Sequence, residues 1–285
     1  MNVADWLARG EAALIEREVP EAKATAEFMM AEVLGVGRAE ALLRAPQELT
    51  AKQSRHFQMW LRERGRRVPL AYIVGHQPFL GLKIAVTRDS LIPRPETEEL
   101  VLECERLLKS AQAAAPKILE IGTGTGCVAI ALAQLLPQAA VFATDVSDKA
   151  LELARKNALA HHVSNRIRFV SEDLFSDKQG LRGWADLLVS NPPYIPTKDL
   201  EDLEPEVKRE PRVALDGGKD GLDATRAIVA SGPKTLKPGG FIALEIERRH
   251  GPVVSGLLRA AGFSGVAVKK DAAGLDRFAI GKMVK

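Results

Sequence analysis

The sequence has few aromatic residues, two cysteines and no long hydrophobic run, and these absences narrow the class of protein. Aromatic residues make up 5% of the 285 residues, hydrophobic residues 46% and charged residues 27%. A disordered chain or a fibrous repeat does not have this balance, so we expect a soluble globular protein with a substantial core. No apolar run reaches about 18 residues and no secretory signal pattern opens the chain, so we expect no membrane span.

Cysteine and histidine are too sparse to build a metal centre or a disulfide framework. Cys104 and Cys127 have neither metal-binding nor redox spacing, and free thiols suit a reducing compartment. This predicts a cytoplasmic protein. No metal is expected, because none of the five histidines has ligand spacing with another or with a cysteine. They are His56, His76, His161, His162 and His250.

The charge of the chain is nearly balanced, which argues against a polycationic partner-binding tail. Lys and Arg number 40 against 37 Asp and Glu, a net charge of +3. One local basic cluster stands out, and it is read either as a phosphate-contacting patch or as the solvated face of a helix. It comprises Arg62, Arg64, Arg66 and Arg67.

The N-terminal part of the chain predicts a small helical domain followed by a short β linker. Apolar residues recur at helical spacing over residues 1–67, and Thr50 is a plausible N-cap for a helix that runs to about Arg67. Two β-prone runs follow, Ala71–Gly75 and Leu82–Val86, separated by a turn with Gly and Pro. We therefore expect a β-hairpin linker at residues 68–90.

Residues 91–285 predict an α/β domain, because strands and helices alternate beyond Pro116. Helices are expected over 127–136 and 149–160, and the last two strands are expected to form an antiparallel pair. The predicted strands are Lys117–Ile121, Ala140–Thr144, Ile167–Val170, Asp186–Ser190, Phe241–Ile246, Gly265–Lys269 and Arg277–Ile280. The sheet should therefore be mostly parallel, with an antiparallel end.

A glycine-rich turn and an acidic residue point to a nucleoside cofactor. The turn consists of Gly122, Thr123, Gly124, Thr125 and Gly126, and it follows the first strand of the α/β domain. A dinucleotide fingerprint would have its third glycine at the position of Cys127, which disfavours a dehydrogenase. Asp145 ends the next strand, at the separation where an acid binds ribose hydroxyl groups, although it could instead cap the following helix.

Asp173 and Leu174 follow the third strand of this domain and reach the same edge of the sheet. Asp173 could accept a hydrogen bond from the amino group of adenine, or it could be a solvated loop carboxylate. Leu174 could border the adenine.

The motif Asn191-Pro192-Pro193-Tyr194 follows an apolar strand and indicates the chemistry. Two adjacent prolines make a rigid loop, in which the Asn191 side-chain oxygen and the Pro192 carbonyl can both accept from one planar NH₂ group. Tyr194 can stack on that plane. Such a clamp suits alkylation of a planar amine or amide, whose nitrogen must be oriented and made electron-rich.

Taken together, these motifs resemble the class I S-adenosylmethionine-dependent methyltransferases that act on planar nitrogens. The segments Ile92–Glu98 and Glu210–Gly218 and the N-terminal helices resemble, more specifically, the HemK/PrmC family. That family methylates the glutamine of the Gly-Gly-Gln motif in class 1 peptide chain release factors, proteins of translation termination. The loop Ile246–Gly251 departs from the family, which often continues after this strand with a glycine and then a glutamine.

The resemblance implies roles for individual residues. Gly122–Gly126 would pack on the methionine part of S-adenosylmethionine, Asp145 would bind its ribose, and Asp173 with Leu174 would border its adenine. Asn191, Pro192, Pro193 and Tyr194 would hold the substrate amide, with Asn191 also next to the cofactor. Ile92–Glu98 would lie against the cofactor pocket, and Glu210–Arg212 would orient nearby loops. Arg94 and Arg212 could equally be structural ion-pair partners.

The resemblance predicts a cytoplasmic, monomeric enzyme that methylates release factors and has no stable nucleic-acid partner. The nearest alternative is an rRNA or DNA methyltransferase acting on an exocyclic amine, since the same clamp suits those groups. Its only support is the Arg62–Arg67 cluster, against a low net charge and few aromatic residues. A noncatalytic cofactor-binding module would not need the clamp.

Overall fold

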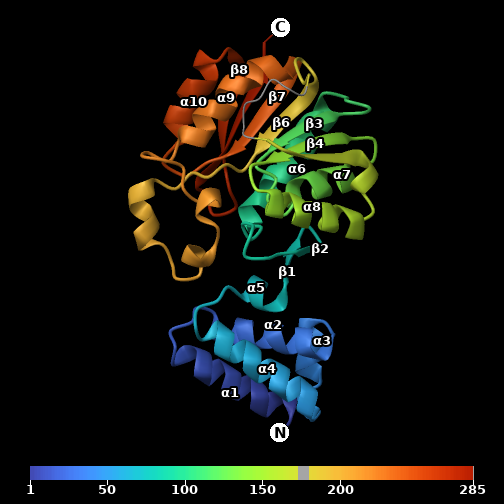
Figure 1. The fold of residues 1–285 in the computed structure, drawn as a ribbon, viewed down its shortest axis with the longest axis vertical. Helices are drawn as coiled ribbons and strands as arrows, with labels where there is room; N and C mark the ends of the chain where they lie inside the picture. Colours follow the sequence, from blue (N-terminus) through green and yellow to red (C-terminus); the bar gives the residue numbers. More distant parts are fainter. Residues whose placement is uncertain (173–179, 285) are drawn as a thin grey trace. The chain divides into compact units, whose positions relative to one another are not determined.

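The computed structural model describes residues 1–172 and 180–284 and divides the chain into two compact units. One unit comprises residues 1–76 together with residues 204–209, and the other comprises residues 77–203 and 210–285. Figure 1 labels most of the helices and strands of each unit. Each unit has its own hydrophobic core. No helix in the described part of the chain has the length and apolar character needed to cross a membrane.

The first unit is helical, as the sequence predicts. Thr50 caps α4 as expected, because its hydroxyl accepts from the backbone N–H of Gln53 while the Gln53 side chain accepts from the N–H of Thr50. Leu14, Met29 and Phe57 are fully buried where these helices meet. The helices are α1 (Val3–Ile15), α2 (Ala22–Leu34), α3 (Arg38–Leu43), α4 (Ala51–Arg64) and α5 (Leu70–Val74).

The first β-prone run of the predicted linker is helical, so that prediction was wrong. Pro69 precedes α5 with an extended backbone, and Gly75 ends the helix with a φ of +82°. These two residues frame a single helical turn that overrides the β propensity of Tyr72, Ile73 and Val74. The hairpin begins after it and pairs β1 (His76–Phe79) with β2 (Leu82–Ala85).

The basic cluster Arg62–Arg67 is divided: Arg62 and Arg66 are exposed, as a solvated surface would have them, whereas Arg64 and Arg67 pair with a carboxylate. Arg64 is buried, and its guanidinium contacts Glu206 at 2.6 Å. Arg67 donates to both carboxylate oxygens of the same residue, at 2.6 and 2.7 Å. Burial opposes ionisation of Glu206, but the hydrogen bonds from Arg67 and Arg64 outweigh it and lower its pKa from 4.5 to about 2. The two arginines therefore serve an internal ion-pair cluster.

We expect Glu206→Gln to lower the free energy of unfolding of the helical unit by about 3 kcal/mol at neutral pH, because Arg64 loses its buried counter-charge. The lowered pKa stabilises the fold above about pH 4.5, and this contribution disappears as the pH falls toward 2. Urea unfolding followed by tryptophan fluorescence measures it. In a Trp184→Phe background only Trp6 and Trp60 remain, and both pack against the core of this unit.

Glu63→Gln is the matched control, because its ion pair with Arg66, at the C-terminal end of α4, is exposed and should contribute less than about 1 kcal/mol. Equal stability losses for the two variants, or a Glu206→Gln loss that persists unchanged below pH 3, would contradict the role of the buried cluster.

The second unit is built on a seven-stranded sheet of order β5-β4-β3-β6-β7-β9-β8. β9 runs antiparallel to β7 and β8, and the other neighbours are parallel, which confirms the predicted fold class. The strands are β3 (Lys117–Ile121), β4 (Ala140–Asp145), β5 (Ile167–Ser171), β6 (Ala185–Ser190), β7 (Leu236–Glu245), β8 (Phe263–Lys270) and β9 (Asp276–Met283). The helices are α6 (Pro95–Ser110), α7 (Cys127–Leu135), α8 (Asp148–Ala160), α9 (Asp223–Thr235) and α10 (Gly251–Ala260).

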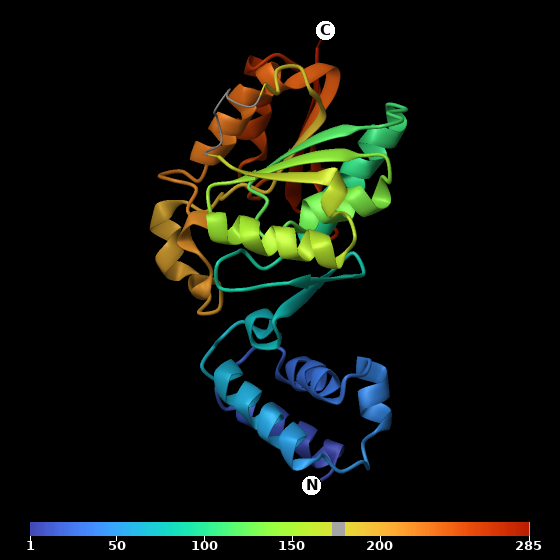
Figure 2. The same ribbon diagram turned by 45° about the vertical axis from the view of Figure 1, so that its right-hand side comes forward.

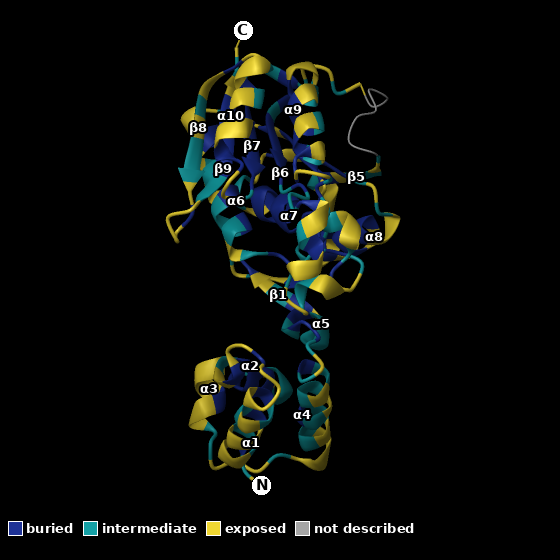
Figure 3. Ribbon diagram, turned by 90° about the vertical axis from the view of Figure 1, so that its left-hand side faces the viewer, coloured by how far each residue is buried: buried dark blue, intermediate teal, exposed yellow. Residues whose placement is uncertain are grey.

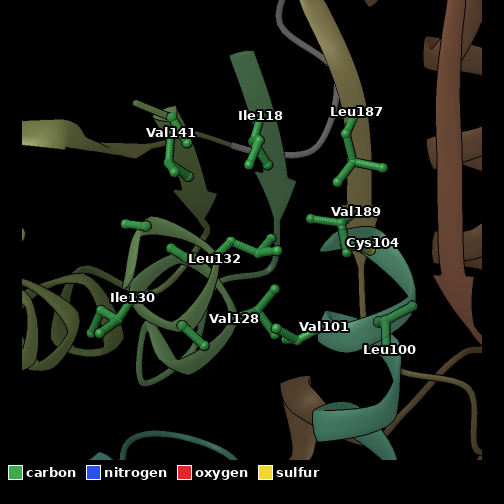
Figure 4. Packing of buried hydrophobic residues seen from close by; sticks show 14 of the residues in the cluster. Leu100, Val101, Cys104, Ile118, Val128, Ile130, Leu132, Val141, Leu187 and Val189 are labelled. Atoms are coloured by element: carbon green, nitrogen blue, oxygen red, sulfur yellow. The ribbon is translucent and has the colours of Figure 1, made fainter. Parts of the chain in front are cut away.

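Helices cover both faces of this sheet. Alternate residues of β3 enter different cores, Ile118 with α6, α7 and α8 and Leu119 with α9 and α10. Figure 2 shows α8, in yellow-green, and α9, in orange, on opposite sides of the strands. In Figure 4, side chains of α6 and α7 point toward those of β3, β4 and β6. Figure 3 shows the central strands dark blue, which matches the continuous apolar runs expected of a parallel sheet covered on both faces.

The register of the central strands brings three sequence motifs to one edge of the sheet. Ile121 at the end of β3 pairs with Thr144 on β4 and with Ser190 on β6. The next residues of the three strands are Gly122, Asp145 and Asn191, so all three leave the sheet at the same level. The order of the strands also reverses at β3: β4 and β5 follow it on one side, and the chain then returns to place β6 and β7 on the other side. Open α/β sheets bind ligands at such a point.

Candidate active site

The glycine-rich turn forms a tight connection between β3 and α7. The N–H groups of Gly122 and Thr123 both donate to the Thr144 carbonyl at 2.9 Å, which holds the turn against the end of β4. Gly126 has a φ of +81°, and a Cβ there would lie 3.0 Å from the Ala154 Cβ on α8. Glycine is therefore required at this position both by the left-handed backbone and by the close approach of α8.

Asp145 links the end of β4 to the glycine-rich turn. One carboxylate oxygen accepts from the N–H of Gly124 at 2.8 Å and the other from the N–H of Ser147 at 2.9 Å. The N-cap of α8 is Ser147, whose hydroxyl accepts from the N–H of Ala150, so the capping alternative for Asp145 was wrong. Each Asp145 oxygen keeps a further lone pair, and Asp145 lines a cavity.

Two adjoining cavities lie at this edge of the sheet, and Leu91, Gly122, Gly124 and Asn191 line both of them. The larger has a volume of about 300 Å³ and also contacts the strand end at Asp145. Its other lining residues are Asp89, Ser90, Thr144, Val146, Ser147, Ala150, Glu172, Pro193, Pro211, Val213, Ala214 and Asp216. The smaller, about 40 Å³, reaches Thr97, Glu120 and Cys127. Asn191 therefore lies where the larger cavity meets the smaller one.

The Asn191–Tyr194 loop is fixed at both ends. The buried Ser190 hydroxyl donates to the Ile121 carbonyl at 2.7 Å and anchors the end of β6 to β3. The Asn191 amide nitrogen donates to the Thr97 hydroxyl at 3.1 Å, and the Tyr194 hydroxyl donates to Glu245 at 3.3 Å. Burial raises the pKa of Tyr194 well above its ordinary value, so the phenol stays protonated.

Two buried carboxyl groups near this loop were not identified from the sequence. Burial raises the pKa of Glu120 to about 8, against a 2.7 Å hydrogen bond from Thr123 that favours the charged form. Burial likewise raises the pKa of Glu245 to about 7, although Thr97, Arg277 and Tyr194 act in the opposite direction. Each interrupts the apolar sequence of a central strand, which is the signal that could have revealed them.

The segments 92–98 and 210–216 border the two cavities, and Arg94 ties them together. Glu210 is buried and accepts from the Ile92 N–H at 2.9 Å and from the Arg94 guanidinium. Arg94 also lines the smaller cavity. Arg212 instead pairs with Asp216 at 3.1 Å on an exposed surface. The ion-pair interpretation is thus correct for both arginines, and Arg94 in addition borders the site.

Not every predicted feature can be placed. Asp173 and Leu174 lie outside the described residues. Within residues 1–172 and 180–284, no three His, Cys, Asp or Glu side chains are grouped as a metal site would require. In the atypical loop Ile246–Gly251, Arg249 folds back onto Glu247 and His250 is buried at the start of α10.

Solved structures share the fold of the second unit. A methyltransferase from Pyrococcus furiosus superposes with a TM-score of 0.52 at 23% identity, over 72% of this chain and 90% of that one. The hMettl16 catalytic domain, solved in complex with the MAT2A 3'UTR hairpin 6, gives a TM-score of 0.57 at 18% identity, over 83% of each chain. At these identities the comparison establishes the methyltransferase fold.

Sequence comparisons identify the family. Residues 5–75 match the PrmC N-terminal domain and residues 102–204 match the Methyltransferase small domain. The release factor glutamine methyltransferase of Geobacter sulfurreducens is 40% identical over 99% of this chain and 96% of its own length, and that of Deinococcus radiodurans is 38% identical over 98% and 97%. The human MTRF1L release factor glutamine methyltransferase is 37% identical over 92% of this chain and 82% of its own. The chain belongs to the release factor glutamine methyltransferase family.

Proposed function

We propose that the protein transfers a methyl group from S-adenosylmethionine to the side-chain amide nitrogen of the glutamine in the Gly-Gly-Gln motif of class 1 release factors. Membership of the family supports this activity. The observation that carries the proposal is the place of Asn191, at the junction of the two cavities and next to the glycine-rich turn. The bond from the methyl group to sulfur breaks as the bond to nitrogen forms, and the products are N-methylglutamine, S-adenosylhomocysteine and a proton that leaves to water.

The residues at the sheet edge fit the proposed cofactor. Asp145 has free lone pairs for ribose hydroxyl groups, and Gly122 and Gly124 bring bare backbone to both cavities. The buried Glu120 carboxyl in the smaller cavity would gain from a nearby positive charge, which would offset the cost of its burial. Asp173 and Leu174 remain proposed contacts of the adenine. When bound, S-adenosylmethionine supplies a methyl group already activated by its positively charged sulfur.

The protein's part in the reaction is to orient the amide and make its nitrogen electron-rich. The Asn191 side-chain oxygen and the Pro192 carbonyl accept from the two N–H groups of the glutamine amide, and Tyr194 stacks on its plane, with Pro193 keeping the loop rigid. Two acceptors on one nitrogen favour the pyramidal form that attacks a methyl group. Cys127 borders the smaller cavity, but burial raises its pKa to about 12, so its thiol is not a nucleophile at neutral pH.

The nucleic-acid alternative is not favoured. Its support came from the Arg62–Arg67 cluster, of which Arg64 and Arg67 are paired with Glu206. The relatives that match over nearly the whole chain are named for a protein substrate. We further propose that residues 1–67 recognise the release factor, that residues 68–90 link the two parts and that residues 91–285 carry catalysis. A cytoplasmic monomer without stable nucleic-acid binding stays a prediction.

The experiment that tests this function is mass spectrometry of a purified class 1 release factor after incubation with the protein and S-adenosylmethionine. We expect one added methyl group, mapped by peptide fragmentation to the glutamine of Gly-Gly-Gln, and none when that glutamine is replaced by alanine. An unmodified release factor, with the methyl label instead in rRNA or DNA, would overturn the proposal in favour of the nucleic-acid alternative.

A further inference from the structure

A chain of hydrogen bonds runs from the substrate clamp to a buried carboxylate that no motif includes. The Asn191 amide nitrogen donates to Thr97 Oγ1 at 3.1 Å, and Thr97 Oγ1 donates to Glu245 Oε2 at 2.7 Å. The Tyr194 hydroxyl reaches the other oxygen, Oε1, at 3.3 Å. Thr97 is in the first turn of α6, and Glu245 is the last residue of β7. Two residues of the clamp are thus connected to one carboxylate, Tyr194 directly and Asn191 through Thr97.

The direction of these hydrogen bonds is set by Glu245. An ionised carboxylate only accepts, so the single hydroxyl proton of Thr97 points to Glu245. The Thr97 oxygen can then only accept from Asn191, which requires the nitrogen of the Asn191 amide on that side. The Asn191 oxygen is consequently turned away from Thr97. The nitrogen and oxygen of an asparagine amide are similar in shape, so packing alone would not decide which of them faces Thr97. The negative charge of Glu245, two hydrogen bonds away, decides it.

The surroundings of Glu245 fix its position and set the pH above which it is charged. Thr97 is 3% exposed and Glu245 is 1% exposed, so neither can exchange these partners for water. Arg277 on β9 lowers the pKa of Glu245 and Glu96 on α6 raises it, while burial is the largest cause of the net rise to about 7. Arg277 is itself held by Asp271 at 3.1 Å. Above about pH 8 the carboxylate form therefore dominates.

We propose that Thr97 and Glu245 are positioning residues for the methyl transfer, which orient the Asn191 amide so that its oxygen faces the substrate nitrogen and hold the Tyr194 ring in place. This proposal rests on the proposed function, because it assumes that Asn191 accepts from the substrate amide. Neither residue reaches the reacting atoms. Their contribution lies in keeping Asn191 from turning its NH₂ group toward the substrate, where it would repel the N–H donors.

The first test compares two substitutions at Thr97, assayed in the full-length protein with a release factor at pH 8. Thr97→Val keeps the shape but removes the hydroxyl, and we expect kcat to fall about 10- to 30-fold, as for loss of one orienting group. Thr97→Ser keeps the hydroxyl and should retain kcat within about 3-fold. The dissociation constant for S-adenosylmethionine, measured by calorimetry, should change less than about 3-fold in both and also reports that they are folded.

The second test asks whether Thr97 and Glu245 act through the same residue. Glu245→Gln leaves one acceptor oxygen where two donors, Thr97 and Tyr194, now bind, so kcat should fall by a similar factor. The double variant with Thr97→Val should lose no more than the worse single variant, because both changes release the same Asn191 amide. Thr235→Val is the matched control, since among the described residues the hydrogen bonds of its hydroxyl go to carbonyls of its own helix at the end of α9. Its kcat should equal that of the wild type.

The outcomes separate this inference from the proposed function. If the wild type methylates the release factor but Thr97→Val and Thr97→Ser have equal kcat, the positioning role is wrong and the function stands. If the kcat losses of the two single variants multiplied in the double variant, the claim that Thr97 and Glu245 both act through Asn191 would also be wrong. If the wild type does not methylate the release factor, the function fails first, and Thr97→Val is then assayed on whichever substrate takes the label.

Discussion

Asn191→Ala should reduce kcat for release factor methylation by about 10²- to 10³-fold while leaving the affinity for S-adenosylmethionine within about 3-fold. The side chain lines both cavities and its amide nitrogen donates to Thr97. In our proposal this contact orients its oxygen to accept from the substrate nitrogen. Loss of one such preorganised group typically costs a factor in this range, because its effect is greatest in the transition state. Single-turnover kinetics with saturating cofactor, together with calorimetry for binding, measures the two quantities separately.

Asn165→Ala is the control for this prediction. Asn165 lies in the short 3₁₀ helix Ser164–Arg166 and lines neither of the two cavities. It should match the wild type in both measurements. If Asn191→Ala weakened cofactor binding as much as it slowed turnover, the residue would be a structural part of the cofactor pocket, and the amide clamp would lose its principal member.

The edge of the sheet could be predicted because its signals are local in the sequence. The central strands β3, β4 and β6 are mostly apolar and each ends at or just before a polar residue or glycine, so Gly122, Asp145 and Asn191 are marked by their position alone. The parallel order then brings such residues to one edge, whatever the details of packing. This reasoning needs no knowledge of which helix covers which face.

The residues that support the clamp could not be found this way, because their partners are distant in sequence. Thr97 is separated from Asn191 by 94 positions and from Glu245 by 148. Helix α6, which carries Thr97, was not predicted either, although Pro95 at its first position and Glu96 and Glu98 in its first turn are ordinary start signals. A network assembled by tertiary contacts leaves no periodic trace in the sequence.

The ion pairs of Arg64 and Arg67 were missed for the same reason. The cluster's arginines recur near the end of α4, where exposed basic residues are common, and the carboxylate that pairs with two of them, Glu206, lies 142 positions from Arg64. The prediction for α5 failed for a different reason. Its five residues are too few to show helical periodicity, and their β propensity dominates. Both errors came from segments whose structure depends on what they pack against.

Asp145→Asn should weaken binding of S-adenosylmethionine by about 30- to 100-fold while kcat at saturating cofactor changes less than about 3-fold. A carboxylate accepts from both ribose hydroxyl groups through charge-assisted hydrogen bonds, which contribute about 1.5–3 kcal/mol each, whereas an amide offers one acceptor oxygen. The same oxygen atoms hold the N–H groups of Gly124 and Ser147, so the substitution also loosens the glycine-rich turn. Calorimetry with S-adenosylmethionine and with S-adenosylhomocysteine should give the same loss, because the ribose is common to both.

Asp148→Asn provides a control of identical chemistry three residues further along the chain. Asp148 is exposed in the first turn of α8 and lines neither cavity, so the same change of charge should leave both constants unaltered. Together with Asn191→Ala, the expected result is a separation of roles, in which Asp145 governs affinity and Asn191 governs turnover. A fall in kcat for Asp145→Asn as large as that for Asn191→Ala would contradict it. The glycine-rich turn would then be transmitting the loss of Asp145 to the reacting groups, and Gly124, which donates to Asp145 and lines both cavities beside Asn191, would be the connection.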